Sequence, residues 1–217
     1  MKGYAIELLR SGVISCPVIP GTKHIDFIAM GFPSHDLIYK NKYWRKMAHQ
    51  SLSYMLMVKG VAENDCNKWF SVATERSNIG VVCATDGLVI LDFDSERSFK
   101  IFERRNTTLV KTTPVERTPQ GYHVYVKIQS DVFCKSLYMR GKREGHVIGI
   151  GGFATCAPSV LDNGRAYAWL PGQSILELEP QRVDKLASLG VSQNSLSSLL
   201  LFVSLRRRPP CGVRHSG

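Results

Sequence analysis

The order of apolar and polar residues in the first sixty positions predicts a helix, a strand and a second helix. Apolar side chains recur at helical spacing over residues 4–9, and Gly12 is placed to end that helix. Residues 13–19 form a short apolar run that stops at Pro20-Gly21, which is typical of a buried strand. Residues 44–58 return to helical spacing, so we expect a second helix there.

The middle of the chain is dominated by runs that predict strands. Residues 80–84 and 88–93 are apolar or β-branched, and the Thr85-Asp86-Gly87 turn between them predicts a hairpin. Ser95 is a suitable N-cap for a helix beginning at the next residue. Further strands are predicted over residues 109–113, 122–128, 147–150, 153–157 and, after the turn Asp162-Asn163-Gly164, over residues 165–170.

This order of elements predicts the fold class and the domain boundaries. Strands in hairpin-rich order with intervening helices favour an α+β domain with a mostly antiparallel sheet. We expect this domain to span residues 1–190. Residues 191–217 are rich in Ser and Leu and then in Arg and Pro, so we interpret them as a flexible tail.

The net charge of the chain favours certain classes of binding partner. Lys and Arg total 28 against 18 Asp and Glu, a formal net charge of +10, which favours a polyanion such as nucleic acid or an anionic membrane surface. A simple gain in solubility is the alternative. No apolar segment approaches the roughly 20 residues that cross a bilayer, and no signal peptide is recognisable. We therefore expect a cytoplasmic protein without a membrane partner, and the scattered cysteines predict no zinc site.

Two carboxylates at the end of an apolar run are the first candidates for chemistry. Side chains alternate along a strand, so Asp92 and Asp94 are expected to point the same way, with Phe93 opposite. Two such carboxylates suit a pair of divalent ions in phosphoryl transfer, and a bound cation would relieve their mutual repulsion. The alternative is that this Asp-Phe-Asp segment is only the solvated end of a strand.

Two basic stretches are candidate nucleic-acid surfaces. Lys and Arg are interleaved with aromatic residues over residues 39–46, and a second basic stretch covers residues 135–143. The alternative for the first is a solvated helix face whose aromatic residues turn inward.

Several segments, in order, resemble the bifunctional primase–polymerase family of the archaeo-eukaryotic primase superfamily. Residues 77–82 (SNIGVV) and 87–94 (GLVILDFD) are similar to its first motif, and residues 118–125 (TPQGYHVY) to its second. Residues 151–159 (GGFATCAPS) resemble its third region, and the turn at residues 163–165 resembles the family's next segment. The resemblance covers about residues 5–172.

The resemblance implies a primase-like catalytic domain, with an RRM-like sheet flanked by helices, that transfers nucleotides as a DNA primase or polymerase. It implies Mg²⁺ or Mn²⁺ as cofactor, template and primer DNA with nucleoside triphosphates as partners, and a helicase or another replication protein as a further candidate partner. The residues carried over are Asp92 and Asp94 for the metal, His123 for the triphosphate, Gly121 for close approach to the nucleotide, and Arg117, Lys127 and Lys23 as weaker phosphate or template contacts.

The chain departs from the family pattern at one metal ligand. The family supplies a third Asp a few residues before the two glycines of its third region, and here His146 stands at that place. Three interpretations are open: His146 is a nitrogen ligand that favours Mn²⁺ or other transition ions, Glu144 reaches the site instead, or the third ligand is missing. The last would leave a catalytically weak or inactive nucleic-acid- or nucleotide-binding module. A metal-dependent nuclease or phosphatase shares the carboxylate pair but leaves the order of the other motifs unexplained.

Overall fold

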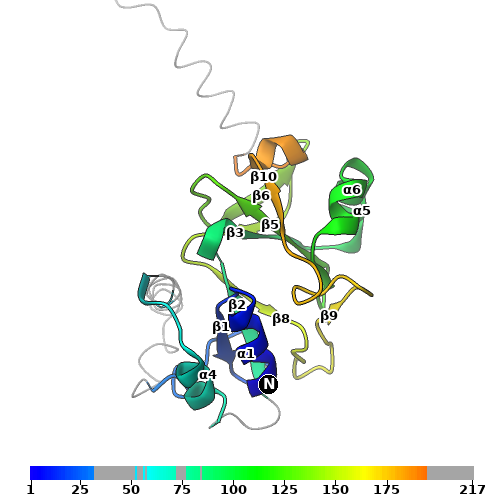
Figure 1. Cartoon of the computed structure of the whole chain (residues 1–217). Coiled ribbons are helices and arrows are strands. Elements are labelled where there is room, and N and C mark those ends of the chain that lie inside the picture. The colour runs from blue at the N-terminus through cyan, green and yellow to red at the C-terminus, as the bar shows by residue number, and fades with distance from the viewer. Residues whose placement is uncertain (32–51, 53–55, 57, 72–76, 84, 195–217) are drawn as a thin grey trace, which may run out of the picture.

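The computed structural model contains two β-sheets with helices packed beside them (Figure 1). It describes residues 1–31, 52, 56, 58–71, 77–83 and 85–194. The smaller sheet is antiparallel, in the order β1-β2-β8, and consists of β1 (Ser15–Val18), β2 (Asn78–Val82) and β8 (Phe153–Cys156). Helices α1 (Lys2–Arg10) and α4 (Glu63–Trp69) lie beside it.

The larger sheet has seven strands, and β3 lies at its centre. Six of them follow the order β6-β7-β3-β5-β4-β9, all antiparallel to their neighbours, while β10 pairs in parallel with the second half of β5. In chain order these strands are β3 (Leu88–Phe93), β4 (Val115–Arg117), β5 (Tyr122–Ile128), β6 (Lys135–Met139), β7 (Lys142–Ile148), β9 (Ala168–Trp169) and β10 (Gln181–Val183).

Each face of the larger sheet contributes to a different core. Leu91 and Phe93 on β3 belong to a core that includes Phe99 and Phe102 of α5 (Glu96–Arg105), and the Phe93 and Phe102 ring centroids are 4.9 Å apart. Ile90, on the opposite face, belongs to a second core with residues of the small sheet and α1. Because side chains alternate, Asp92 shares the face of Ile90, which is the face toward the small sheet.

The predicted fold class is confirmed, since helices are combined with mostly antiparallel sheets. The helix predicted over residues 4–9, the strands over 88–93, 122–128 and 153–157, and the helix capped by Ser95 are also present. The side-chain oxygen of Ser95 accepts a hydrogen bond from the backbone N–H of Ser98, as an N-cap does.

The predicted hairpin between residues 80–84 and 88–93 is wrong. β2 and β3 are both strands, but they belong to different sheets and do not pair with each other. The short 3-10 turn Thr85–Gly87, with a φ of 50° at Asp86 and 73° at Gly87, carries the chain from one sheet to the other. The turn that predicted a hairpin therefore connects a strand of the small sheet to a strand of the large sheet.

The strand predicted over residues 109–113 is also wrong. Residues Thr107–Thr112 form helix α6, whose Val110 is buried in the core shared with α5. Its β-branched residues favour a strand by propensity, but tertiary packing overrides that preference. Thr113, before Pro114, has the extended backbone that ends the helix.

The basic stretch at residues 135–143 is a hairpin that the sequence did not reveal. β6 and β7 are joined at Arg140-Gly141, where both residues have positive φ (49° and 79°), as in a type I′ turn. The strand predicted over 165–170 shrinks to Ala168–Trp169, preceded by a bridge between Val160 and Ala166.

Some predictions fall largely or wholly outside the described residues. The helix over residues 44–58 lies mostly there, and so do the basic and aromatic residues 39–46 and the tail beyond residue 194. The folded domain itself extends past residue 190, because Val191 is buried and Ser192 exchanges two backbone hydrogen bonds with Tyr138 (2.8 and 3.0 Å). Among the described residues no helix combines the length and the apolar character that crossing a membrane requires.

Candidate metal and nucleotide site

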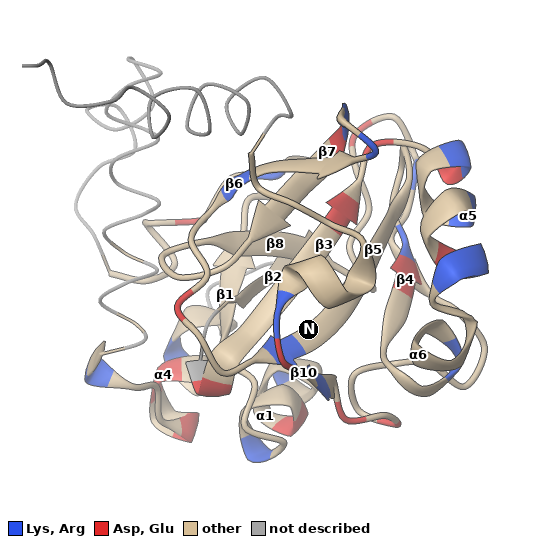
Figure 2. Cartoon of the chain, turned by 90° about the horizontal axis from the view of Figure 1, so that it is seen from above, with Lys and Arg blue, Asp and Glu red and all other residues tan. Residues whose placement is uncertain are grey.

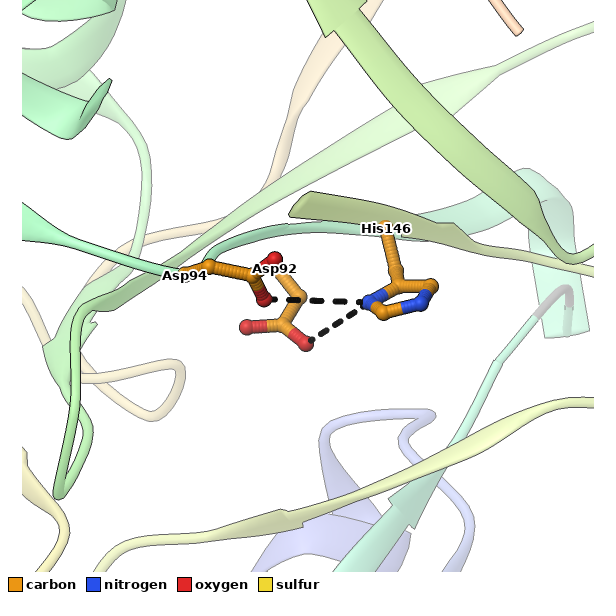
Figure 3. Close-up of side chains that lie close together, drawn as sticks. All are labelled: Asp92, Asp94 and His146. Carbon is orange, nitrogen blue, oxygen red and sulfur yellow. Dashed lines mark ion pairs between the residues drawn. The ribbon is translucent and has the colours of Figure 1, made fainter. Parts of the chain in front are cut away.

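Three potential metal ligands meet at the polar end of β3 (Figure 3). Asp92 lies on β3, Asp94 comes immediately after that strand, and His146 comes from the neighbouring strand β7. One ligand atom from each lies within 4.8 Å of the others, and His146 Nδ1 is 3.9 Å from Asp92 Oδ2 and 3.8 Å from Asp94 Oδ1. The shared direction of the two carboxylates, expected from strand alternation, is therefore observed.

Strand register explains why these residues meet. Asp92 is paired directly with His146 on β7 and with His123 on β5, so both imidazoles flank one carboxylate on the same face of the sheet. Glycine at two positions lets the flanking strands approach this closely. A Cβ at Gly145 would overlap the carbonyl oxygen of Asp92, and one at Gly121 would overlap that of Phe93.

Gly121 was predicted to allow close approach to a nucleotide. Its backbone approaches β3 instead, so the fold itself accounts for the absence of a side chain at this position. A contact between Gly121 and the nucleotide stays a prediction.

His123 is buried beneath Asp92 and is held by a second carboxylate. Its side chain is only 6% exposed, its Nε2 lies 3.4 Å from Asp92 Oδ1, and its Nδ1 lies 2.7 Å from Glu116 Oε1. Burial alone would lower the pKa of His123, but its contacts with Asp92 and Glu116 outweigh burial and raise that pKa to about 9.

The same contacts act on Asp92. Burial favours the neutral carboxyl, but the His123 imidazole, and then the charges of His146 and Lys23, lower the pKa of Asp92 below its usual value. Asp92 is therefore ionised at neutral pH, in the form that binds a cation.

Glu116 is a component of this region that the sequence analysis missed. It lies on β4 directly opposite His123, and its carboxylate is completely buried. It also accepts hydrogen bonds from the hydroxyl of Tyr125 (2.5 Å) and the backbone N–H of Ala157 (2.7 Å). In the sequence, Glu116 lies between the strands predicted over residues 109–113 and 122–128, where an acid is expected to be exposed.

Of the two candidate replacements for the third acid, His146 is the one near the carboxylate pair. Glu144 lies on the same strand, but its carboxylate accepts a hydrogen bond of 2.5 Å from the hydroxyl of Ser98 on α5. His146 is half exposed, and its Nε2 lies 2.8 Å from a guanidinium nitrogen of Arg143.

Two of the three ligands line one cavity, and residues next to the ligands in the sequence line a second. One, of about 550 Å³, is lined by Asp92 and His146 together with Lys135, Ser136 and the glycines 151 and 152. The other, of about 430 Å³, lies between the start of α5 and the β6–β7 hairpin. It is lined by Ser95, Arg97, Ser98, Ile101, Met139, Arg140, Lys142 and Glu144. Both volumes are in the size range of small-molecule sites.

Three basic residues were predicted to contact phosphate or template, and they differ in their position relative to the carboxylates. Lys23 is exposed, and its charge reaches Asp92. Arg117 is next to Glu116 on β4, so by alternation it projects from the opposite face of the sheet. Lys127 pairs with Leu88 at the far end of β3 and forms ion pairs with Asp86 (2.7 Å) and Glu179 (2.9 Å). The structure therefore brings Lys23, but neither Arg117 nor Lys127, toward the carboxylates.

The chemistry of the ligand set fits a divalent cation. Two carboxylates supply the oxygen atoms that Mg²⁺ and Mn²⁺ prefer, and one imidazole nitrogen suits Mn²⁺ better than Mg²⁺.

Comparison with known proteins assigns the chain to a family. No curated protein matches the chain significantly. The family model described as bifunctional DNA primase/polymerase, N-terminal, matches residues 56–184, a range that includes both carboxylates and both histidines and covers more than half of the chain. The chain therefore belongs to the bifunctional DNA primase/polymerase (Prim-Pol) family.

Proposed function

We propose that the protein is a template-directed nucleotidyltransferase, a DNA primase or polymerase, that works with Mg²⁺ or Mn²⁺ held by Asp92, Asp94 and His146. At the level of the family, primase/polymerase-type nucleotidyl transfer is supported by the match over residues 56–184. The observation that carries the proposal to these residues is the meeting of three ligand atoms within 4.8 Å, beside a cavity.

The role of each side chain is derived from its chemistry. A divalent cation at this place would stabilise the charge that develops at phosphorus and on the pyrophosphate, and would activate the primer 3′-hydroxyl. Asp92 is kept ionised by His123, while the more exposed Asp94 and His146 complete the ligand set.

The nucleoside triphosphate is assigned to the larger cavity. Its lining combines Lys135 and Ser136 with the Gly151-Gly152 segment. An anionic ligand therefore meets a cation, a hydroxyl and a stretch of backbone without side chains. Lys23 is a further candidate for phosphate contact, because its charge already acts on Asp92. His123 is buried, which favours support of Asp92 over direct contact with the triphosphate.

The nucleic-acid backbone is assigned to the second cavity, of about 430 Å³. Arg97, Arg140 and Lys142 are exposed around it, and none of the three forms an ion pair within the described part of the chain. Lys and Arg positions are marked in blue along the ribbon of α5 and near the turn between β6 and β7 (Figure 2). Unpaired cations around this cavity suit the phosphates of a primer or template strand.

One observation favours a second candidate, a binding module of the same fold without catalysis. If Nε2 of neutral His146 accepts a hydrogen bond from Arg143, then Nδ1 carries the proton and cannot bind a metal. Metal binding by Nδ1 requires the opposite tautomer and the loss of this hydrogen bond.

Primer extension separates the two candidates. A labelled primer on a short template is incubated with dNTPs and either Mg²⁺ or Mn²⁺, with the parent and with Asp92→Ala. The proposal predicts extension by the parent, strongest with Mn²⁺, and no extension by Asp92→Ala, while the DNA affinity of the two proteins stays similar. Salt-sensitive DNA binding by a parent that extends no primer with either metal would establish the binding module instead.

A further inference from the structure

Glu116 is a fully buried carboxylate whose hydrogen-bond partners converge from two parts of the fold. Its Oε1 accepts from His123 and Tyr125 on β5, and its Oε2 accepts from the backbone N–H of Ala157, just after β8. A buried carboxylate is costly unless donors surround it, and here three donors do so. This carboxylate touches neither of the two cavities beside the ligands.

The contacts of Glu116 continue through His123 to the metal ligands. The imidazole lies between two carboxylates, with Nδ1 2.7 Å from Glu116 and Nε2 3.4 Å from Asp92 Oδ1. The other oxygen of Asp92, Oδ2, faces His146 Nδ1 at 3.9 Å. One oxygen of Asp92 therefore faces the protein interior, and the other faces the proposed metal position.

We propose that Glu116 is a positioning residue: by fixing the ring of His123 from behind, it holds Asp92 with Oδ2 presented to the cation. The inference rests on the proposed metal site and deepens it. Partners that orient a metal ligand in this way typically change metal affinity by about 10–100-fold when removed. The side chain of His123 has little freedom of its own, since it is 6% exposed and packs beside Tyr125 and Tyr167.

A purely structural role for Glu116 makes a different prediction. In that case removing any hydrogen bond at Glu116 loosens the core equally, whichever donor is removed. Tyr125→Phe provides this control, because it removes the other donor to Oε1 and leaves the hydrogen bond between Glu116 and His123 in place. Glu116→Gln and Glu116→Met keep the volume of the side chain and remove its charge or its acceptors.

The test is direct Mn²⁺ binding to the full chain without nucleotide or DNA, measured by electron paramagnetic resonance of free Mn²⁺. We expect Glu116→Gln and Glu116→Met to weaken Mn²⁺ binding about tenfold or more, and Tyr125→Phe to change it less than about twofold. Unchanged affinity in both Glu116 variants would overturn the inference. An equal loss of affinity in Tyr125→Phe would overturn it as well.

A second readout covers the case in which neither Glu116 variant folds. The ring ¹⁵N signals of His123 in the parent, assigned by their absence in His123→Gln, are recorded with and without Mg²⁺. A shift on adding Mg²⁺ supports coupling from the cation to the ring, whereas no shift contradicts it.

Failure of the inference can be told apart from failure of the proposed function. If the parent and Asp92→Ala bind Mn²⁺ equally weakly, the metal site itself is refuted. If Asp92→Ala loses binding while both Glu116 variants keep it, only the positioning role of Glu116 is refuted.

Discussion

At the scale of single residues, the site depends on how buried charges compensate one another. Asp92 and Glu116 lie on either side of His123, and the three side chains form a carboxylate–imidazole–carboxylate chain. A positive charge on the imidazole stabilises this arrangement, because it attracts both carboxylates. Removal of that charge should therefore change both the free energy of unfolding and the affinity of Asp92 for a cation.

The free energy of unfolding should fall as pH rises from about 6.5 to about 9. The pKa of His123 is raised from 6.5 to about 9, so its charged form stabilises the folded state fully below pH 6.5, and this contribution is lost as pH rises through the folded pKa. A shift of this size corresponds to about 3 kcal/mol. Urea unfolding at pH 6 and pH 9.5, with chelator present, measures it. His123→Gln should lack this change, and an equal change in both proteins would contradict the assignment to His123.

The identity of the third ligand should set the preference for metal. We expect His146→Asp to shift primer extension from Mn²⁺ toward Mg²⁺, because an oxygen donor replaces nitrogen beside Asp92 and Asp94. The ratio of initial rates in the two metals measures the shift. Glu144→Gln serves as the control, since Glu144 binds Ser98 and its replacement should leave the ratio unchanged. A ratio that moves with Glu144 and not with His146 would show that His146 is the wrong residue.

At the scale of elements, the site is made by the close packing of three strands at the end of β3. β5 and β7 flank it, and each brings one histidine into register with Asp92. Gly145 on β7 and Gly121, just before β5, each admit a β3 carbonyl oxygen where a side chain would stand. The geometry of the ligands therefore depends on residues that carry no chemistry themselves.

Gly121→Ala should destabilise the fold, because the new Cβ would overlap the carbonyl oxygen of Phe93. Overpacking of this kind costs roughly 1–3 kcal/mol in unfolding free energy. Gly3→Ala is the matched control: Gly3 lies in α1 with no atom near its Cβ position, so alanine there should be neutral or stabilising. Denaturant unfolding compares the two, and a neutral Gly121→Ala would mean that β5 can move away from β3 without cost.

At the scale of the whole molecule, two of the proposed metal ligands line a cavity of about 550 Å³, and exposed Arg and Lys residues line a second cavity. β7 contributes to both cavities, with His146, Val147 and Ile148 in the first and Lys142 and Glu144 in the second. In the proposed function the first cavity takes the triphosphate and the second takes the nucleic acid, and the basic residues of the second belong to the excess that gives the net charge of +10.

Replacement of Arg97, Arg140 and Lys142 by Gln should weaken DNA binding and reduce its dependence on salt. Removing one phosphate contact lowers the magnitude of the slope of log affinity against log salt by roughly 0.7–0.9, so the slope of the triple variant should be smaller by roughly 2–3. A charge-matched control replaces the exposed residues Lys2, Lys68 and Lys111 on α1, α4 and α6. Equal slopes for the two triple variants would show that only total charge matters.

Part of this molecule could be predicted from its sequence, and the rest depended on long-range pairing. The alternation around Asp92 and Asp94 is local, so their common direction was predictable. The role of Glu116 was not, because only the register of β4 with β5 places it against His123. The separation of β2 and β3 into different sheets and the helical state of residues 107–112 also depend on tertiary partners.

The most direct test of the central claim is incorporation of a single nucleotide opposite each of the four template bases, with Mn²⁺, while released phosphate species are measured. The account predicts that only the complementary nucleotide is added, that one pyrophosphate is released per addition, and that Asp94→Ala abolishes both. Release of inorganic phosphate or shortened primers, without any addition, would contradict it and would identify a phosphatase or nuclease instead.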